Sequence, residues 1–178
     1  MKKVVVVSGS PRMNGNCEIL CREFIRGAQE AGNWVDFIPL SQHRIDYCIG
    51  CCKCTETGSC FQSDAMNGFN RLLLQADVIV LATPVYFYSM TAQMKAFIDR
   101  MMPVYQKIRA DIYLMVAAWD DNCIHIESTV AALRGLTRDC LEDCPEKGLL
   151  VATDILEKGA VMDHPEYMKW AYKMGLGC

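Results

Sequence analysis

The sequence lacks a hydrophobic run long enough to cross a membrane, and it lacks an excess of basic residues. The apolar run at residues 4–7 is closed by Ser8, so the N-terminus is too short in hydrophobic residues for an export signal. The formal net charge is -3, with 18 Lys and Arg against 21 Asp and Glu. Nucleic-acid binders usually carry a basic face. We therefore expect a cytoplasmic protein that binds neither nucleic acid nor a membrane.

Two familiar nucleotide-binding motifs are also absent. The Gly- and Ser-rich residues 8–17 contain neither the G-x-x-x-x-G-K-[ST] loop nor the G-x-G-x-x-G fingerprint. The three histidines, His43, His125 and His164, stand apart from one another and from other reactive side chains. We therefore assign these histidines no catalytic role.

Cysteine, in contrast, is abundant. The chain of 178 residues contains 11 cysteines, and five of them crowd into residues 48–60: Cys48, Cys51, Cys52, Cys54 and Cys60. In a small secreted protein this would indicate a disulfide framework, but this chain shows no export signal and is long enough for a full core. In a reducing cytosol, clustered thiols favour metal, iron–sulfur or redox chemistry.

Apolar patterning predicts five strands that alternate with helices. The expected strands cover residues 4–7, 34–40, 76–82, 111–118 and 148–155. The expected helices cover residues 16–31, 64–75, 91–102, 128–141 and 165–174. Such alternation predicts a parallel sheet covered on both faces, in a single α/β domain of residues 1–178. Residues 41–63 form a cysteine-rich connection, and a loop of that length is usually functional or held by something.

The loop after the first strand is a candidate phosphate site. Open α/β sheets bind ligands at the carboxyl ends of their strands, and the following helix presents free N–H groups there. Ser10, Asn16 and the backbone of Cys17 can donate hydrogen bonds, and Arg12 adds positive charge. The alternative is an ordinary turn with good helix-capping residues.

Four stretches in order along the chain carry a family resemblance. The first is Gly9-Ser10-Pro11-Arg12 with Gly15-Asn16, and the second runs from Cys48-Ile49-Gly50-Cys51 to Asp64-Ala65-Met66. The third joins Thr83-Pro84-Val85-Tyr86 to Met94-Lys95 and Asp99-Arg100, and the fourth joins Lys158-Gly159 to His164-Pro165-Glu166. Together they resemble the flavodoxin-like NAD(P)H-dependent FMN reductases, and especially their iron–sulfur flavoprotein branch. The family usually has Thr where this chain has Cys17.

The resemblance implies a flavodoxin-like three-layer sandwich with a five-stranded parallel sheet of order 2-1-3-4-5. FMN would bind at the switch between strands one and three. By matching motif, the residues that hold its phosphate would be Ser10, Arg12, Asn16 and Cys17. The residues that line its ring would be Pro84, Val85, Tyr86 and Phe87, with Trp119 as a further contact from the loop after strand four. The family also implies a homodimer or homotetramer.

The spacing of the cysteines indicates a second cofactor, separate from FMN. Cys48, Cys51 and Cys54 follow the pattern C-x-x-C-x-x-C, and Cys60 comes after five more residues. Compact spacing of this kind is common in iron–sulfur sites, and by resemblance these four cysteines would ligate a [4Fe–4S] cluster. Cys52 would be a bystander. The alternatives are a loop without a cluster, a zinc site and a redox dithiol formed by Cys51 and Cys54.

The predicted function follows from the two cofactors. The flavin carries the chemistry, so no catalytic role is assigned to a protein side chain. We expect an FMN-dependent oxidoreductase that passes electrons from NAD(P)H or a reduced ferredoxin-like carrier to a quinone, a flavin or a partner protein, through the [4Fe–4S] cluster where one is present. One alternative is a non-enzymatic electron-transfer flavodoxin, although such a protein would be more acidic. The others are a flavin reductase without a cluster and a zinc-stabilised binding module.

Overall fold

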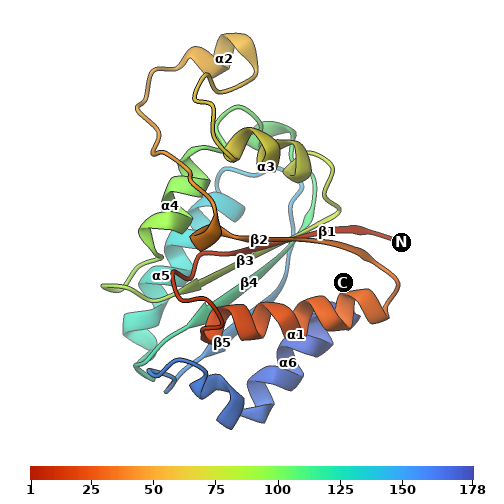
Figure 1. Ribbon diagram of the computed structural model, residues 1–178, viewed down its shortest axis with the longest axis vertical. Coiled ribbons are helices and arrows are strands. Elements are labelled where there is room, and N and C mark those ends of the chain that lie inside the picture. Colours follow the sequence, from red (N-terminus) through yellow and green to blue (C-terminus); the bar gives the residue numbers. More distant parts are fainter.

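The computed structural model describes residues 1–178, apart from the side chain of Cys123 (Figure 1). Its five strands are β1 (Lys3–Ser8), β2 (Trp34–Pro39), β3 (Val78–Pro84), β4 (Asp111–Ala117) and β5 (Glu146–Ala152). They form one parallel sheet in the order β2-β1-β3-β4-β5. The predicted fold class and strand order are therefore confirmed.

Helices cover both faces of this sheet. The α-helices are α1 (Asn16–Glu30), α2 (Lys53–Thr57), α3 (Met66–Leu73), α4 (Ala92–Asp99), α5 (Cys123–Thr137) and α6 (Pro165–Leu176), and the short 3-10 helices are η1 (Leu40–Gln42), η2 (Tyr105–Lys107) and η3 (Ala160–Asp163). Figure 1 shows α1 and α6 on one face, α3, α4 and α5 on the other, and α2 projecting away from the sheet. Among the described residues, no helix combines the length and the apolar character that a membrane span requires.

The valines of β1 explain why this strand is hydrophobic at every position. Val4 and Val6 belong to the core under α1 and α6, whereas Val5 and Val7 belong to the core under α3, α4 and α5. All four are at most 1% exposed. Successive side chains of a strand point to opposite faces, so a central strand between two helical layers buries both sets.

A close crossing of α1 and α6 fixes the layer beneath the sheet. A Cβ atom on Gly175 would lie 2.0 Å from the carbonyl oxygen of Phe24, and one on Gly27 would lie 2.2 Å from that of Tyr172. Backbone therefore meets backbone where the two helices cross, and only glycine leaves enough space on each side.

The start of α5 differs from the prediction. The expected helix began at residue 128, but Asn122 caps the helix by accepting a 3.1 Å hydrogen bond from the N–H of Ile124. The hydroxyl of Ser128 instead donates to the carbonyl oxygen of Tyr88. Asn is as good an N-cap as Ser, so local sequence did not decide between the two positions.

The end of β5 also differs from the prediction, which extended it to residue 155. The ladder ends at Ala152, and Asp154 then turns the chain with a φ of 60°. Ile155 lies beyond this turn, and its N–H donates to the carbonyl oxygen of Ala118 at 3.2 Å. The apolar side chain that suggested a longer strand belongs instead to the loop over the strand ends.

Candidate functional site

Loops from four strand ends meet at one edge of the sheet and enclose a cavity of about 90 Å³. Eight of the nine residues predicted to bind FMN line it: Ser10, Arg12, Asn16, Cys17, Pro84, Val85, Tyr86 and Trp119. The ninth, Phe87, lines a neighbouring cavity of about 420 Å³, which shares Val85, Tyr86 and Trp119 with the first. The structure therefore brings the predicted residues together at the expected switch between β1 and β3.

The first turn of α1 provides the donors for an anion. Its N-cap is Gly15, and no side chain of the described residues caps the helix. The first N–H groups of a helix lack partners within the helix, and the helix dipole favours negative charge at that end. Ser10 shapes the preceding loop, because its hydroxyl oxygen accepts a 3.2 Å hydrogen bond from the N–H of Arg12.

Cys17 is compatible with an anion next to it, although the family usually has Thr there. Burial raises the pKa of this thiol to about 12, and a hydrogen bond with the backbone of Ala117 opposes the rise only in part. The thiol is therefore protonated and uncharged near pH 7, so it does not repel a phosphate.

Arg12 and Asn16 join the phosphate loop to the segment after β5. The guanidinium of Arg12 donates to the carbonyl oxygen of Leu156 at 3.0 Å. The side-chain amide of Asn16 donates to the carbonyl oxygens of Ile155 and Glu157, each at 2.9 Å. The two side chains were predicted as phosphate ligands, but here they hold a wall of the cavity, and both amide hydrogens of Asn16 are engaged in doing so.

The loop after β3 makes a strained turn at the rim. Tyr86 and Ser89 exchange two backbone hydrogen bonds of 2.9 and 3.0 Å, and between them Phe87 and Tyr88 have φ values of 48° and 61°. A left-handed conformation costs a residue with a side chain about 1–2 kcal/mol. The turn presents Phe87 fully exposed beside the cavity, and strain of this kind is common at ligand sites.

Sequence reasoning missed two parts of this edge. Ile155 and Leu156 line the smaller cavity, and they were missed because β5 was expected to continue through residue 155. His125 lines the larger cavity, where its Nδ1 is hydrogen-bonded to Asp120 and its ring centroid lies 4.7 Å from that of Tyr88. The available signal was topological, since the carboxyl ends of all parallel strands meet at one edge.

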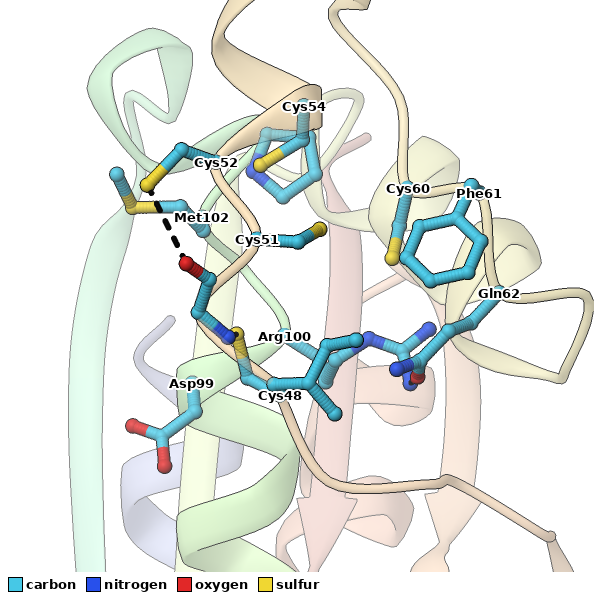
Figure 2. A pocket seen from close by; sticks show the side chains of 13 residues that line it. Cys48, Cys51, Cys52, Cys54, Cys60, Phe61, Gln62, Asp99, Arg100 and Met102 are labelled. Carbon is cyan, nitrogen blue, oxygen red and sulfur yellow. Dashed lines mark hydrogen bonds between the residues drawn. The ribbon is translucent and has the colours of Figure 1, made fainter.

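The cysteine-rich segment surrounds a separate cavity of about 300 Å³ (Figure 2). All five of its cysteines line this space, together with residues that follow α4, including Arg100 and Met102. Cys52 differs from the others, because its Sγ is directed to the carbonyl oxygen of Gly50 at 3.5 Å.

Cys54 is surrounded by the other three predicted ligands. Burial raises the pKa of its thiol, and the nearby Cys60, Cys48 and Cys51 raise it further. These three cysteines are the other members of the predicted ligand set, and Cys52 is not among the groups that raise the pKa of Cys54. Mutual repulsion of this kind is relieved when a cationic centre binds the thiolates.

The donor set fits a large cofactor better than a single ion. Among the described residues, no three His, Cys, Asp or Glu side chains stand close enough to hold one metal ion. Four thiols line one cavity of about 300 Å³, and four Cys thiolates are the usual ligands of a [4Fe–4S] cluster. The residues present therefore fit a [4Fe–4S] cluster.

Arg100 fastens this segment to the body of the protein. Its side chain is 1% exposed and pairs with Asp64, which is 4% exposed, through contacts of 2.7 and 3.0 Å. The same guanidinium donates to the carbonyl oxygen of Asp46 at 2.6 Å and to the side chain of Gln62. Burial raises the pKa of the Asp64 carboxyl, but hydrogen bonds from Arg100, Asp46 and Met66 outweigh it and lower the pKa overall.

Helix α4 links the two regions. Its N-cap, Thr91, is hydrogen-bonded to Gly9 of the phosphate loop, and its C-cap, Arg100, lines the cysteine cavity. The two ends of an eight-residue helix are about 12 Å apart at the usual rise per residue. The cysteine cavity lies at the C-terminal end of this helix, and none of the residues that line it lines either of the two cavities at the strand ends.

Comparison with known proteins agrees with this geometry. A model of the NADPH-dependent FMN reductase family matches residues 2–128. An iron–sulfur flavoprotein of Archaeoglobus fulgidus is 41% identical over 101 residues, which are 57% of this chain and 46% of the relative. An iron–sulfur flavoprotein of Methanocaldococcus jannaschii is 39% identical over 102 residues, which are 57% of this chain and 53% of the relative. The chain thus spans about half the length of these curated relatives.

The fold itself has well-matched solved counterparts. The NAD(P)H:quinone oxidoreductase from Methanothermobacter marburgensis superposes with a TM-score of 0.76, covering 99% of this chain and 96% of that protein. The sequence identity is 13%, so this likeness concerns the fold alone. It confirms the flavodoxin-like arrangement predicted from the sequence.

Proposed function

The chain belongs to the NADPH-dependent FMN reductase family, and we propose that it binds FMN at the carboxyl edge of its sheet and works as an oxidoreductase. The observation that carries the proposal is the convergence of Ser10, Arg12, Asn16 and Cys17 with Pro84, Val85, Tyr86 and Trp119 around one cavity. These residues come from three separate loops, and the sequence motifs predict each of them at an FMN site. The predicted FMN cofactor is confirmed at the level of the family.

Each part of the cavity has a task that its chemistry supports. FMN, when bound, supplies a ring that accepts and releases hydride or single electrons. The uncapped first turn of α1 binds its phosphate, and Arg12 supplies a counter-charge. Pro84, Val85 and Tyr86 hold the ring against the sheet edge, and the loop at Ile155 keeps water from one side.

We propose in addition that Cys48, Cys51, Cys54 and Cys60 ligate a [4Fe–4S] cluster. Their arrangement around one cavity, the direction of the Cys52 Sγ to the carbonyl oxygen of Gly50 and the names of the relatives support this assignment. The cluster, when bound, supplies single-electron transfer.

The electron donor that best fits the family is a reduced nicotinamide, and the acceptor that best fits the cavity is a flat ring such as a quinone or flavin. The larger cavity supports this, because the aromatic side chains of Tyr86, Phe87, Tyr88 and Trp119 all line it. A second candidate donor is a ferredoxin-like protein, favoured by the exposed Cys48 and Cys51 at the surface. A homodimer or homotetramer remains part of the proposal, because Phe87 at the rim is fully exposed.

One preparation tests both cofactors. Protein purified without oxygen is examined by visible spectroscopy, and its FMN, iron and acid-labile sulfide are counted per chain. We expect the two flavin bands with a broad iron–sulfur shoulder between them. Anaerobic addition of NADH and of NADPH then shows which nucleotide bleaches the flavin.

The outcomes separate the two assignments. A protein that carries no flavin and takes up none when FMN is added contradicts the central proposal. A yellow protein without iron, even after reconstitution with iron and sulfide, contradicts only the cluster. Gel filtration of the same preparation gives the oligomeric state.

A further inference from the structure

Arg100 is a buried charge whose hydrogen bonds reach the two stems of the cysteine segment. Through the carbonyl oxygen of Asp46 it contacts the entry stem, and through Gln62 and Asp64 it contacts the exit stem. Asp64 in turn accepts a 3.0 Å hydrogen bond from the N–H of Asp46, so the two stems are also joined to each other. A buried arginine is costly unless it is well paired, and these contacts pair most of its donors.

The Nε atom of Arg100 takes no part in these contacts. Among the described residues, its Nε–H is buried without a hydrogen-bond partner. The side chain lines the cavity of the four predicted ligands, and Figure 2 shows its guanidinium at the base of that cavity, below Cys54 and Cys60. Buried polar groups nearly always have partners, so an unpaired donor at a cofactor cavity indicates an acceptor that belongs there.

The position of Cys60 agrees with an acceptor at this place. Cys60, one of the four proposed ligands, lines the same cavity as Arg100. A guanidinium beside a thiolate stabilises negative charge on sulfur. Hydrogen bonds to sulfur and local charge are the means by which a protein sets the potential of an iron–sulfur cluster.

We propose that Arg100 is the positioning residue of the iron–sulfur site: it holds both stems of the cysteine segment, and its Nε–H donates to a sulfur atom at the base of the cavity. The inference rests on the cluster proposed above, and it adds a group that touches no iron. Its positive charge stabilises the cluster more in the reduced state than in the oxidised state, because reduction adds an electron.

The test compares two variants with a matched control. Arg100→Gln removes the charge, and Arg100→Gln combined with Asp64→Asn removes both members of the buried pair, so that no unpaired carboxylate remains if the single variant folds poorly. Arg44→Gln is the control, because Arg44 pairs with Asp46 on the same stem at 3.0 Å but is 83% exposed. Circular dichroism verifies that each protein is folded.

Three measurements follow. Hydrogen exchange of residues 46–64 in the metal-free protein measures how stably the cysteine segment is held. The rate of iron loss to a chelator measures how well the cluster is retained. A redox titration followed by electron paramagnetic resonance gives the reduction potential of the cluster. For both Arg100 variants we expect faster exchange, iron loss accelerated about tenfold or more and a potential shifted to a more negative value. The control should match the unchanged protein in all three.

Each remaining outcome is decisive. A cluster that keeps its potential and its retention in the Arg100 variants overturns the proposal, and so does faster exchange with an unchanged potential, which would mark a purely structural pair. Unchanged protein that takes up no iron overturns the cluster itself. In that case the exchange of residues 46–64 still decides whether Arg100 holds the segment.

Discussion

The hydroxyl of Thr91 donates a 2.7 Å hydrogen bond to the carbonyl oxygen of Gly9, 82 residues earlier in the chain. The hydroxyl oxygen of Thr91 accepts a hydrogen bond from the N–H of Met94, and the N–H of Thr91 donates to the hydroxyl of Thr83. One fully buried side chain thus caps α4 and fixes the loops after β1 and β3 to each other. A Cβ on Gly9 would lie 2.9 Å from that of Met94, so this close approach also requires glycine.

Replacing Thr91 should therefore weaken both the fold and the cofactor site. Thr91→Val keeps the shape but leaves the carbonyl oxygen of Gly9 buried without its donor, which costs about 1–3 kcal/mol of unfolding free energy. Urea unfolding measures that loss, and FMN titration of the apoprotein should show weaker binding. Thr91→Ser keeps the hydroxyl and serves as the control. Equal affinity in the Val and Ser variants would show that the bond does not support the site.

The cysteine segment allows a test within a few residues. Cys54→Ser should abolish the iron signal, because Cys54 lies among the three other predicted ligands. Cys52→Ser should leave the iron content unchanged, because the Sγ of Cys52 is directed to the carbonyl oxygen of Gly50. Both variants should retain FMN. Iron retained in the first variant and lost in the second would require a different ligand set.

The crossing of α1 and α6 leads to opposite expectations for two helical glycines. Gly175→Ala should be strongly destabilising, because the added Cβ would lie 2.0 Å from the carbonyl oxygen of Phe24 and neither backbone can yield cheaply. Gly135→Ala in α5 meets no atom within 4 Å and should stabilise the protein by about 0.5–1 kcal/mol through helix propensity. Thermal unfolding of the two variants measures the contrast, and stabilisation by both would contradict the close crossing.

Acid stability should depend on Glu146. Hydrogen bonds from Arg134, at 2.6 and 2.9 Å, are the main cause that lowers the pKa of this carboxyl from 4.5, and burial opposes them. A carboxyl whose pKa is lower in the folded state contributes stability above its unfolded pKa, and that contribution is lost as the pH falls through the folded value.

Glu146→Gln should therefore cost about 1 kcal/mol near neutral pH and should flatten the loss of stability below about pH 4.5. Urea unfolding between about pH 3 and about pH 7 measures the slope. Glu142→Gln is the control, since Glu142 is 78% exposed and only 3.5 Å from Arg109. A variant of Glu146 with the same acid slope as the unchanged protein would show that the pair carries no pH dependence.

Much of the fold could be predicted from the sequence, because strand burial and helix capping depend on residues that are close together in the chain. The valines of β1 are buried on both faces, Thr91 and Asp64 act near their helix starts as expected, and the strand order agrees with the family resemblance. Boundaries were wrong where two nearby residues were equally suitable. Asn122 and Ser128 both have side chains that favour a helix N-cap. Asn122 caps α5, whereas the hydroxyl of Ser128 is hydrogen-bonded to the carbonyl oxygen of Tyr88.

The site followed the same division. Motifs identified the residues of the loop after β1, the loop after β3 and the cysteine segment, because the residue types in these segments indicate their chemistry. They did not identify Ile155 and Leu156, which reach the cavity only because β5 ends at a turn.

The sequence by itself therefore determined which reactive groups are present and which motifs are absent. It contains clustered cysteines and a Gly- and Ser-rich loop, and it lacks the two nucleotide-binding motifs of other protein classes. Tertiary structure alone decided that Cys52 is directed away from the other thiols, that Cys17 stays uncharged and that Arg100 contacts both stems of the cysteine segment. These properties depend on burial and on distances between residues far apart in the chain, and neither is a property of a residue type or of its spacing.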